Sequence, residues 1–126
     1  MANTISQSGN PESLGARVTE MSLDTFGAIK DVDNGSTTLH AIYAHVSAGS
    51  DFLLLWNALN PVPGTDAPDF QFPIGQNTVI VIPGGIPFNV ALSACAANVG
   101  GTASSGNPTN PMTVNLYTVP DIAASA

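Results

Sequence analysis

From Leu39 to Val119, nearly every stretch long enough to form a structural element alternates or runs apolar in the manner of a β-strand. Gly, Pro, Asn and Ser fill the gaps, and no segment shows the 3.6-residue period of an amphipathic helix. The pattern predicts strands over 17–23, 28–32, 37–46, 51–56, 69–74, 78–82, 88–97 and 112–119. Because turns and two long connections join the strands, we expect an all-β fold: a single antiparallel β-sandwich, jelly-roll-like, with seven or eight strands.

The sequence divides into an arm, a sandwich and a tail. Residues 1–16 are polar with few apolar anchors, 17–119 hold the predicted strands, and 120–126 form a short tail. We expect the arm to be disordered in the free domain and to become ordered on a partner through Ile5, Pro11 and Leu14. Within the sandwich, Asn34-Gly35 between two strand-like runs predicts a β-hairpin, because both residues accept a positive φ.

Charge is the unusual part of the composition. Only 9% of the 126 residues are charged, against about 25% in an average globular domain, while the hydrophobic fraction is an ordinary 44%. A folded chain with such a neutral surface is often one that contacts other proteins. The net charge of −7, with Arg17 and Lys30 as the only cations, disfavours binding to nucleic acid. No apolar run approaches the ~20 residues of a membrane span or forms the core of a signal peptide, so we expect a chain made in the cytoplasm that does not enter membranes.

The sequence predicts no enzyme, cofactor or metal site. It has no Gly-x-Ser-x-Gly elbow and no phosphate-binding glycine loop, and the single cysteine, Cys95, is expected to be a small buried side chain. His40 and His45 are five residues apart in a predicted strand, so they should point to opposite faces and not act as joint ligands. Asp66, next to Thr65 and before Ala67-Pro68, is better explained as a turn-forming residue than as a ligand, although a calcium ion at Asp66 and Asp69 is left open.

Two predicted strands are apolar on both faces, whereas a sandwich sheet should have one wet face. We expect one face of each strand to fill the core, through Leu53, Leu55, Ile80 and Ile82. The other face would form a ridge that needs a cover, made of Phe52, Leu54, Trp56, Val79 and Val81. The cover could be the chain's own arm or long loops, a second copy or a partner protein, and we expect another chain to bury this ridge.

The run from Leu39 to Val119 resembles a family of small structural proteins from tailed bacteriophages. The resemblance covers most of the chain and depends on the order of six pieces: Leu39-His-Ala-Ile-Tyr, Phe52-Leu-Leu-Leu-Trp-Asn57, Gly64-Thr-Asp-Ala-Pro68, Phe72-Pro-Ile-Gly75, Gly85-Ile-Pro-Phe88 and Thr113-Val-Asn-Leu-Tyr117. It implies a virion β-sandwich protein with no catalytic residues. The sequence departs from the family at the apolar outer positions Leu54, Val79 and Val81, where polar residues are common, and in the tail 120–126.

From the resemblance we expect a head decoration or cement protein, located on the virion, that contacts the major capsid protein. A homo-oligomer is expected, with a trimer favoured. A tail, neck or fibre component is the alternative within the same class. A carbohydrate-binding sandwich is the alternative from another class, and it would have to use Trp56, Tyr43 and Tyr117, the only Trp and Tyr residues.

Overall fold

The computed structural model describes residues 3–8, 17–100 and 106–121, and in these it contains eight strands and no helix. The strands are β1 (Thr4–Ser8), β2 (Arg17–Leu23), β3 (Thr37–Val46), β4 (Asp51–Asn57), β5 (Phe70–Ile74), β6 (Thr78–Phe88), β7 (Leu92–Ala97) and β8 (Met112–Pro120). All neighbouring strands are antiparallel. The expected all-β fold is confirmed.

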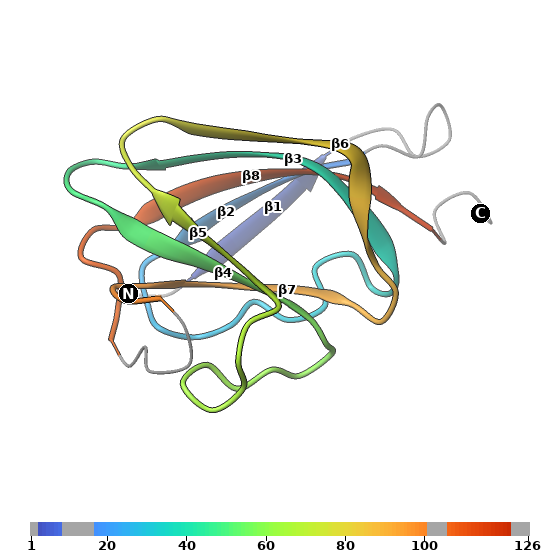
Figure 1. Ribbon diagram of the computed structural model, residues 1–126, viewed down its shortest axis with the longest axis horizontal. Helices are drawn as coiled ribbons and strands as arrows, with labels where there is room; N and C mark the ends of the chain where they lie inside the picture. Colours follow the sequence, from blue (N-terminus) through green and yellow to red (C-terminus); the bar gives the residue numbers. More distant parts are fainter. Residues whose placement is uncertain (1–2, 9–16, 101–105, 122–126) are drawn as a thin grey trace.

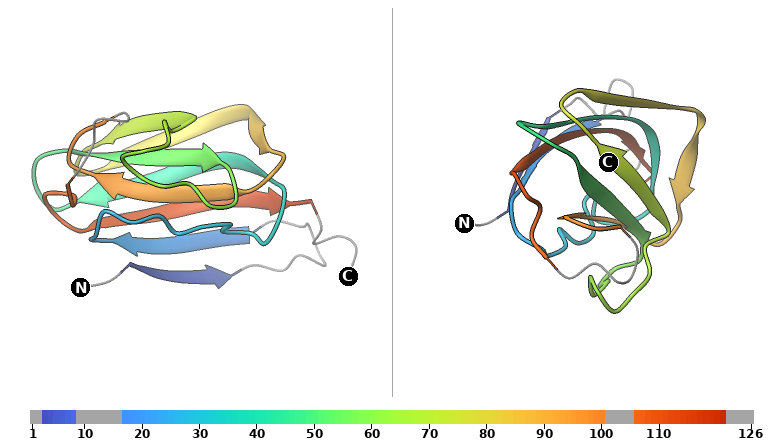
Figure 2. Two further views of the ribbon diagram at one scale, coloured as in Figure 1. Left: turned by 90° about the horizontal axis from the view of Figure 1, so that it is seen from below. Right: turned by 60° about the vertical axis from the view of Figure 1, so that its left-hand side comes forward.

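Two sheets face each other and form a β-sandwich (Figures 1 and 2). One sheet has five strands in the order β1-β2-β8-β3-β6, and the other has three in the order β5-β4-β7. The chain passes from one sheet to the other after β3, β5, β6 and β7, which is the jelly-roll type of wrapping expected from the long connections. The free edges of the larger sheet are β1 and β6, because each pairs with one described strand only.

The core lies between the sheets and follows from the two-residue period of the strands. In β8, Met112, Val114 and Leu116 are fully buried while Thr113 and Asn115 between them are not. Side chains of alternate residues in β2, β3 and β4 meet them from both sheets, which gives one continuous apolar cluster. As expected, Leu53 and Leu55 are fully buried in this cluster, and Ile80 and Ile82 pack against it while remaining partly exposed.

The predicted hairpin around Asn34-Gly35 is wrong, although the turn itself forms. Asn34 and Gly35 have φ values of 55° and 136°, and the N–H of Gly35 donates to the Asp31 carboxylate at 2.7 Å. Residues 28–32, however, do not pair with β3. They run beside β7 instead, where Ile29 and Ala94 exchange backbone hydrogen bonds of 2.8 and 2.9 Å. The turn therefore carries the chain from the three-stranded sheet to the five-stranded sheet.

The prediction of a disordered N-terminal arm is also wrong for its first half. Thr4–Ser8 form β1, which pairs with all but the ends of β2, from Thr4 opposite Ser22 to Ser8 opposite Val18. Two amide side chains fix the strand from its ends: Asn3 accepts hydrogen bonds from the backbone N–H groups of Asp24 and Thr25 at 2.9 and 3.2 Å, and Gln7 donates to Val32 O at 2.8 Å. Backbone pairing and amide side chains thus replace the apolar anchors that the arm lacks.

An irregularity between Leu39 and Ala41 shifts the register of β3 against both β6 and β8. On the β6 side it lies next to Gly84 and Gly85, whose φ values of 81° and 79° are strained for any residue with a side chain. A Cβ on Gly85 would lie 2.5 Å from Cγ2 of Thr38, so any other residue here would force the Thr38 side chain to shift. Beyond Ile82 the long strand β6 therefore bends, as Figure 1 shows.

Candidate interaction surface

The outer face of the three-stranded sheet is covered by the chain itself. Leu54 and Trp56 are 1% and 2% exposed, and they form a second apolar cluster with Cys95 and Ala97 of β7. Phe26 and Ala28 from the segment after β2, and Ala58 from the segment after β4, pack against this cluster. The expectation that another chain buries Leu54 and Trp56 is therefore wrong, and Phe52 beside them is already partly buried.

The loop after β4 is built around Asp66 and Asp69. The Asp66 carboxylate accepts the backbone N–H of Val62 at 2.9 Å, and its backbone carbonyl accepts the indole N–H of Trp56 at 3.2 Å. The Asp69 carboxylate accepts the backbone N–H of Asn57 at 2.7 Å. The bond to Val62, four residues earlier, fits the turn-forming role expected of Asp66, whereas Asp69 bonds across the loop to the end of β4. Among the described residues no three His, Cys, Asp or Glu side chains come together as metal ligands, at this loop or elsewhere.

Val79 and Val81 lie on the other side of the molecule from Leu54 and Trp56. They belong to β6, in the five-stranded sheet, so the five residues expected to form one ridge occupy the outer faces of two opposite sheets. Sequence alternation identified each outward-facing residue but gave no information about which strands share a sheet. Val79 and Val81 are 65% and 69% exposed, the largest exposures among the large apolar side chains of the described residues.

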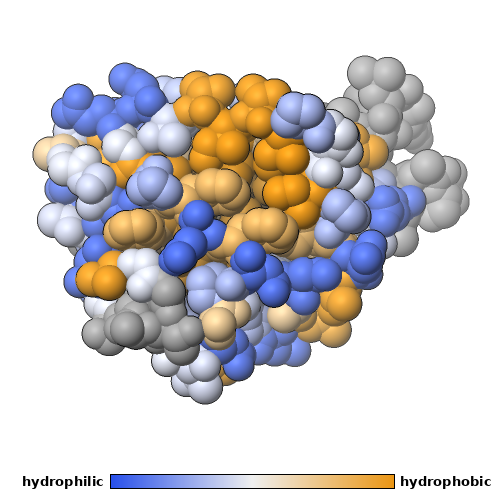
Figure 3. Space-filling view, viewed as in Figure 1, coloured by the Kyte–Doolittle hydropathy of each residue, from blue (hydrophilic) through white to orange (hydrophobic). Residues whose placement is uncertain are grey.

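Their neighbours on the sheet extend the apolar surface. The strand register places Val79 opposite Tyr43, and it aligns Val81 with Ala41, which in turn lies opposite Tyr117. Tyr117 is 41% exposed. Tyr43, Ala41 and Tyr117 could not be assigned to this surface from the sequence, because their position beside β6 depends on the strand order β8-β3-β6. Figure 3 shows an apolar area over β6 at the edge of the molecule.

Charge is absent from this part of the sheet. The three adjacent strands β8, β3 and β6 contain no Asp, Glu, Lys or Arg. The charged residues of the described chain lie instead on β2, at the start of β4, just after β8, and in the segments 24–36 and 57–69. These three adjacent strands therefore form a continuous part of the sheet without a charged side chain. We call this surface, with Val79, Val81, Ala41, Tyr43 and Tyr117 on its outer face, the β6 surface.

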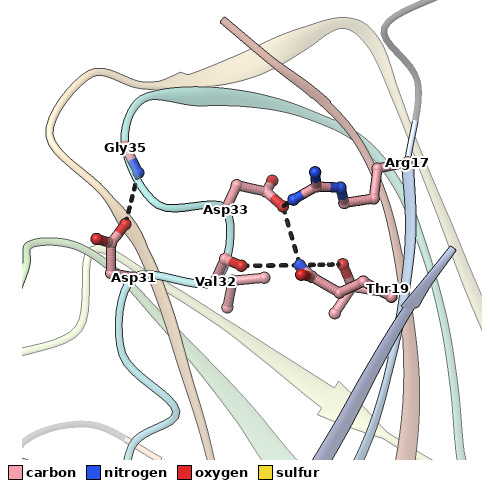
Figure 4. Close-up of polar contacts among 7 residues, drawn as sticks. Arg17, Thr19, Asp31, Val32, Asp33 and Gly35 are labelled. Carbon is pink, nitrogen blue, oxygen red and sulfur yellow. Dashed lines mark hydrogen bonds and ion pairs between the residues drawn. The ribbon is translucent and has the colours of Figure 1, made fainter. Parts of the chain in front are cut away.

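A polar cluster lies at the opposite, β1, side of the sheet (Figure 4). Asp33 is 2% exposed, and its Oδ1 atom accepts from Arg17 and from Gln7, each at 3.2 Å. The Gln7 amide also donates to Thr19 at 3.0 Å. One of the two cations of the chain is thus used to neutralise a buried carboxylate. The cluster links β1, β2 and the segment that leads into the Asn34-Gly35 turn. We therefore interpret it as a structural contact that holds these segments together.

The two histidines lie on the same face of β3, contrary to the sequence-based expectation. Leu39 and Ile42 are both fully buried although they are three residues apart, because the irregularity at His40 adds one residue to the strand. His40 is exposed on the outer face, and His45, also on that face, contacts the backbone carbonyl of Gln76 through Nδ1. Five residues of strand separate them by roughly 16 Å, so they still cannot bind one metal ion together.

The remaining predicted contact residues are Ile5, Pro11 and Leu14. Ile5 is 44% exposed on β1, and Pro11 and Leu14 lie outside the described residues. A hollow of about 340 Å³ runs beside Ile5, and its lining is made of Thr4, Ile5, Ser6, Glu20, Met21, Ser22 and Thr113. This lining holds one carboxylate, that of Glu20, and its other polar groups are the hydroxyls of Ser and Thr residues.

Burial determines the chemistry available to Cys95 and Trp56. Cys95 is fully buried in β7, as expected from the sequence, and burial raises the pKa of its thiol to about 12 despite a hydrogen bond with the Gly27 backbone. Trp56 is buried and therefore provides no platform on which a sugar ring could stack. Of the Trp and Tyr residues expected to serve a carbohydrate, Tyr117 and Tyr43 remain on the surface, and the Tyr43 hydroxyl donates to the Asn77 side chain at 3.1 Å.

No family model matches the chain, and no curated protein matches its sequence. The residues that the structure describes include no helix long and apolar enough to cross a membrane.

Proposed function

We propose that this chain is a non-enzymatic structural protein of a tailed-bacteriophage virion, and specifically a decoration or cement protein that stabilises the head. The assignment to phage virions comes from the ordered sequence pieces between Leu39 and Val119. In this proposal the protein is assembled onto particles in the host cytoplasm, contacts the major capsid protein and also contacts copies of itself.

The observation that carries an interaction role is the β6 surface. Val79 and Val81 are 65% and 69% exposed on β6. Neither β6 nor its neighbours β3 and β8 contain a charged residue, although the chain has a net charge of −7. Apolar surface left in water costs about 25 cal/mol per Å², and a soluble monomer gains nothing from gathering such side chains in one place. A protein that attaches to a virion covers them.

The same surface would serve a tail, neck or fibre component, which is the second location within the proposed class. The two locations differ in the partner and not in the chemistry of attachment. Particles without tails and isolated tails therefore distinguish them: a decoration protein binds the first, and a tail component binds the second.

Binding to particles that lack the protein tests the proposal. Purified protein is mixed with such heads, or with isolated tails, and the bound fraction is measured by co-sedimentation. We expect the native chain to sediment with heads and Val81→Glu to lose most of this binding, because a carboxylate would be buried without a partner. Val90→Glu is the matched control, since Val90 is 51% exposed outside the β6 surface. Absence of binding to both heads and tails by the folded native chain would refute the proposal.

A further inference from the structure

β6 is an open edge of the five-stranded sheet. Among the described strands it pairs with β3 alone, so the backbone groups on its other side have no strand partner. Proteins usually protect such edges with lysines, prolines or bulges, because an unprotected edge pairs with other chains. The second half of β6 is protected in this way by Pro83, the glycines that follow and Pro87. The first half, Thr78–Ile82, contains neither a charge nor a proline.

The first half of β6 is also self-complementary. Its sequence, Thr-Val-Ile-Val-Ile, consists entirely of β-branched residues and is nearly symmetric about Ile80. If two copies pair antiparallel about a twofold axis at Ile80, each Val79 faces a Val81 and each Thr78 faces an Ile82. Cross-strand pairs of β-branched side chains stabilise antiparallel sheets. The reversed sequence is identical at positions 79, 80 and 81 and differs only at the ends, where Thr78 meets Ile82.

Both faces of this strand have room for a neighbour. On the outer face Val79 and Val81 are exposed, and on the inner face Ile80 and Ile82 remain partly exposed although they pack against the core. The opposite sheet ends at the adjacent edge with β5, where Phe70 and Phe72 are likewise only partly buried. A strand added beside β6 would therefore cover apolar side chains on both of its faces. Figure 3 shows this edge as an apolar area.

The near-symmetric sequence favours a second copy as the occupant, and the charge distribution permits one at this edge. Two chains of net charge −7 repel each other, and they can meet with least repulsion where neither carries a carboxylate. The uncharged strands β8, β3 and β6 provide that approach. A partner recruited by charge would instead need carboxylates at the edge, and β6 offers none.

We propose that Thr78–Ile82 pairs antiparallel with the same segment of a second copy, so that the two five-stranded sheets join into one continuous sheet. Ile80 lies opposite Ile80 of the second copy, and Val79 lies opposite its Val81. The pairing ends at Ile82, because Pro83 lacks a backbone N–H and Gly84 begins the bend. The contact is isologous and closes as a dimer, in place of the trimer expected from the sequence. This inference rests on the proposed role of the β6 surface as an interface and names its partner.

Disulfide trapping tests both the contact and its register. Val79→Cys and Val81→Cys are prepared separately in the full chain and mixed under oxidised glutathione. In the proposed register the two introduced thiols are directly opposite, within the range that a disulfide spans. Two copies of the same variant place their thiols about 8 Å apart, beyond that range. We expect a covalent dimer in the mixture and little in either variant alone. The native chain is the control for Cys95, which is buried.

Sedimentation of the native chain, Val79→Lys and Val90→Lys supplies a second readout. We expect a dimer for the native chain and for Val90→Lys, and a folded monomer for Val79→Lys. A native monomer, aggregates of no defined size, or equal trapping within single variants and in the mixture would each overturn the pairing. The particle-binding assay, run alongside these measurements, tests the proposed function independently of the dimer. A chain that binds heads as a monomer disproves only the dimer, and a trapped dimer that binds no particle disproves only the virion role.

Discussion

The indole N–H of Trp56 donates to the backbone carbonyl of Asp66 at 3.2 Å, from a side chain that is only 2% exposed. This hydrogen bond ties the loop after β4 to the outer face of the three-stranded sheet. It explains why the apolar residues on that face need no second chain: the loop is long enough to fold back, and Asp66 gives it a fixed shape.

The burial of Trp56 predicts its fluorescence. As Trp56 is the only tryptophan, emission reports this site alone. We expect a blue-shifted maximum in the native state and little quenching by iodide at any protein concentration, because the chain itself provides the cover. Denaturant should shift the emission to longer wavelength. Protection from iodide that disappears on dilution, while circular dichroism remains unchanged, would mean that a second chain covers the indole.

Leu54 and Val79 should respond to truncation in opposite ways. Leu54→Ala removes a side chain that is 1% exposed in the cluster under the loops, and we expect it to lower the free energy of unfolding by about 2–5 kcal/mol. Val79→Ala removes one that is 65% exposed, and we expect a change within about 0.5 kcal/mol for the monomer. Urea unfolding followed by circular dichroism measures both. Similar losses for the two variants would contradict the assignment of these residues to different environments.

Gln7 is predicted to hold β1 in place. Its side-chain amide lies within 3.2 Å of three acceptors, on Thr19, Val32 and Asp33. We expect Gln7→Ala to destabilise the chain by about 1–2 kcal/mol and to speed amide hydrogen exchange in β1 more than in β8. Ser6→Ala is the control, because Ser6 lies opposite Glu20 on the other face of the same strand. If removal of residues 1–8 leaves the melting temperature unchanged, β1 contributes nothing to the isolated domain.

The positions of most strands could be predicted from the sequence, but the segments that pack on their outer faces could not. The two-residue period of β4 and β8 places their side chains on alternate faces, and this is a local property. Whether the outer face of β4 is wet, covered by loops or covered by another chain depends on contacts of Phe26 and Ala58, which come from separate loops. No local pattern contains that information.

A two-residue hydrophobic period also cannot predict where a strand gains an extra residue or which strand a segment pairs with. The extra residue at His40 reverses the faces of everything before it in β3, so His40 and His45 share a side despite their odd spacing. Residues 28–32 have the composition of a strand and run along β7, yet only Ile29 forms a bridge there. The Asn34-Gly35 signal was accurate about backbone conformation and wrong about the partner of the segment before it.

The buried thiol of Cys95 predicts a pH dependence of stability. Its pKa is about 12 in the folded chain against 9.0 for an ordinary thiol, because burial disfavours the thiolate. The unfolded chain loses this proton first, so the contribution is complete below pH 9 and is lost as the pH rises from 9 toward 12. The slope approaches about 1.4 kcal/mol per pH unit between these values. Cys95→Ala should remove this component while tyrosine and lysine titrations remain. Urea unfolding of both chains at pH 8 and pH 10.5 measures the difference, and we expect the native chain to lose more stability than the variant. An equal loss in the two chains, or rapid reaction of the native thiol with a disulfide reagent at pH 8, would show that Cys95 is accessible to water.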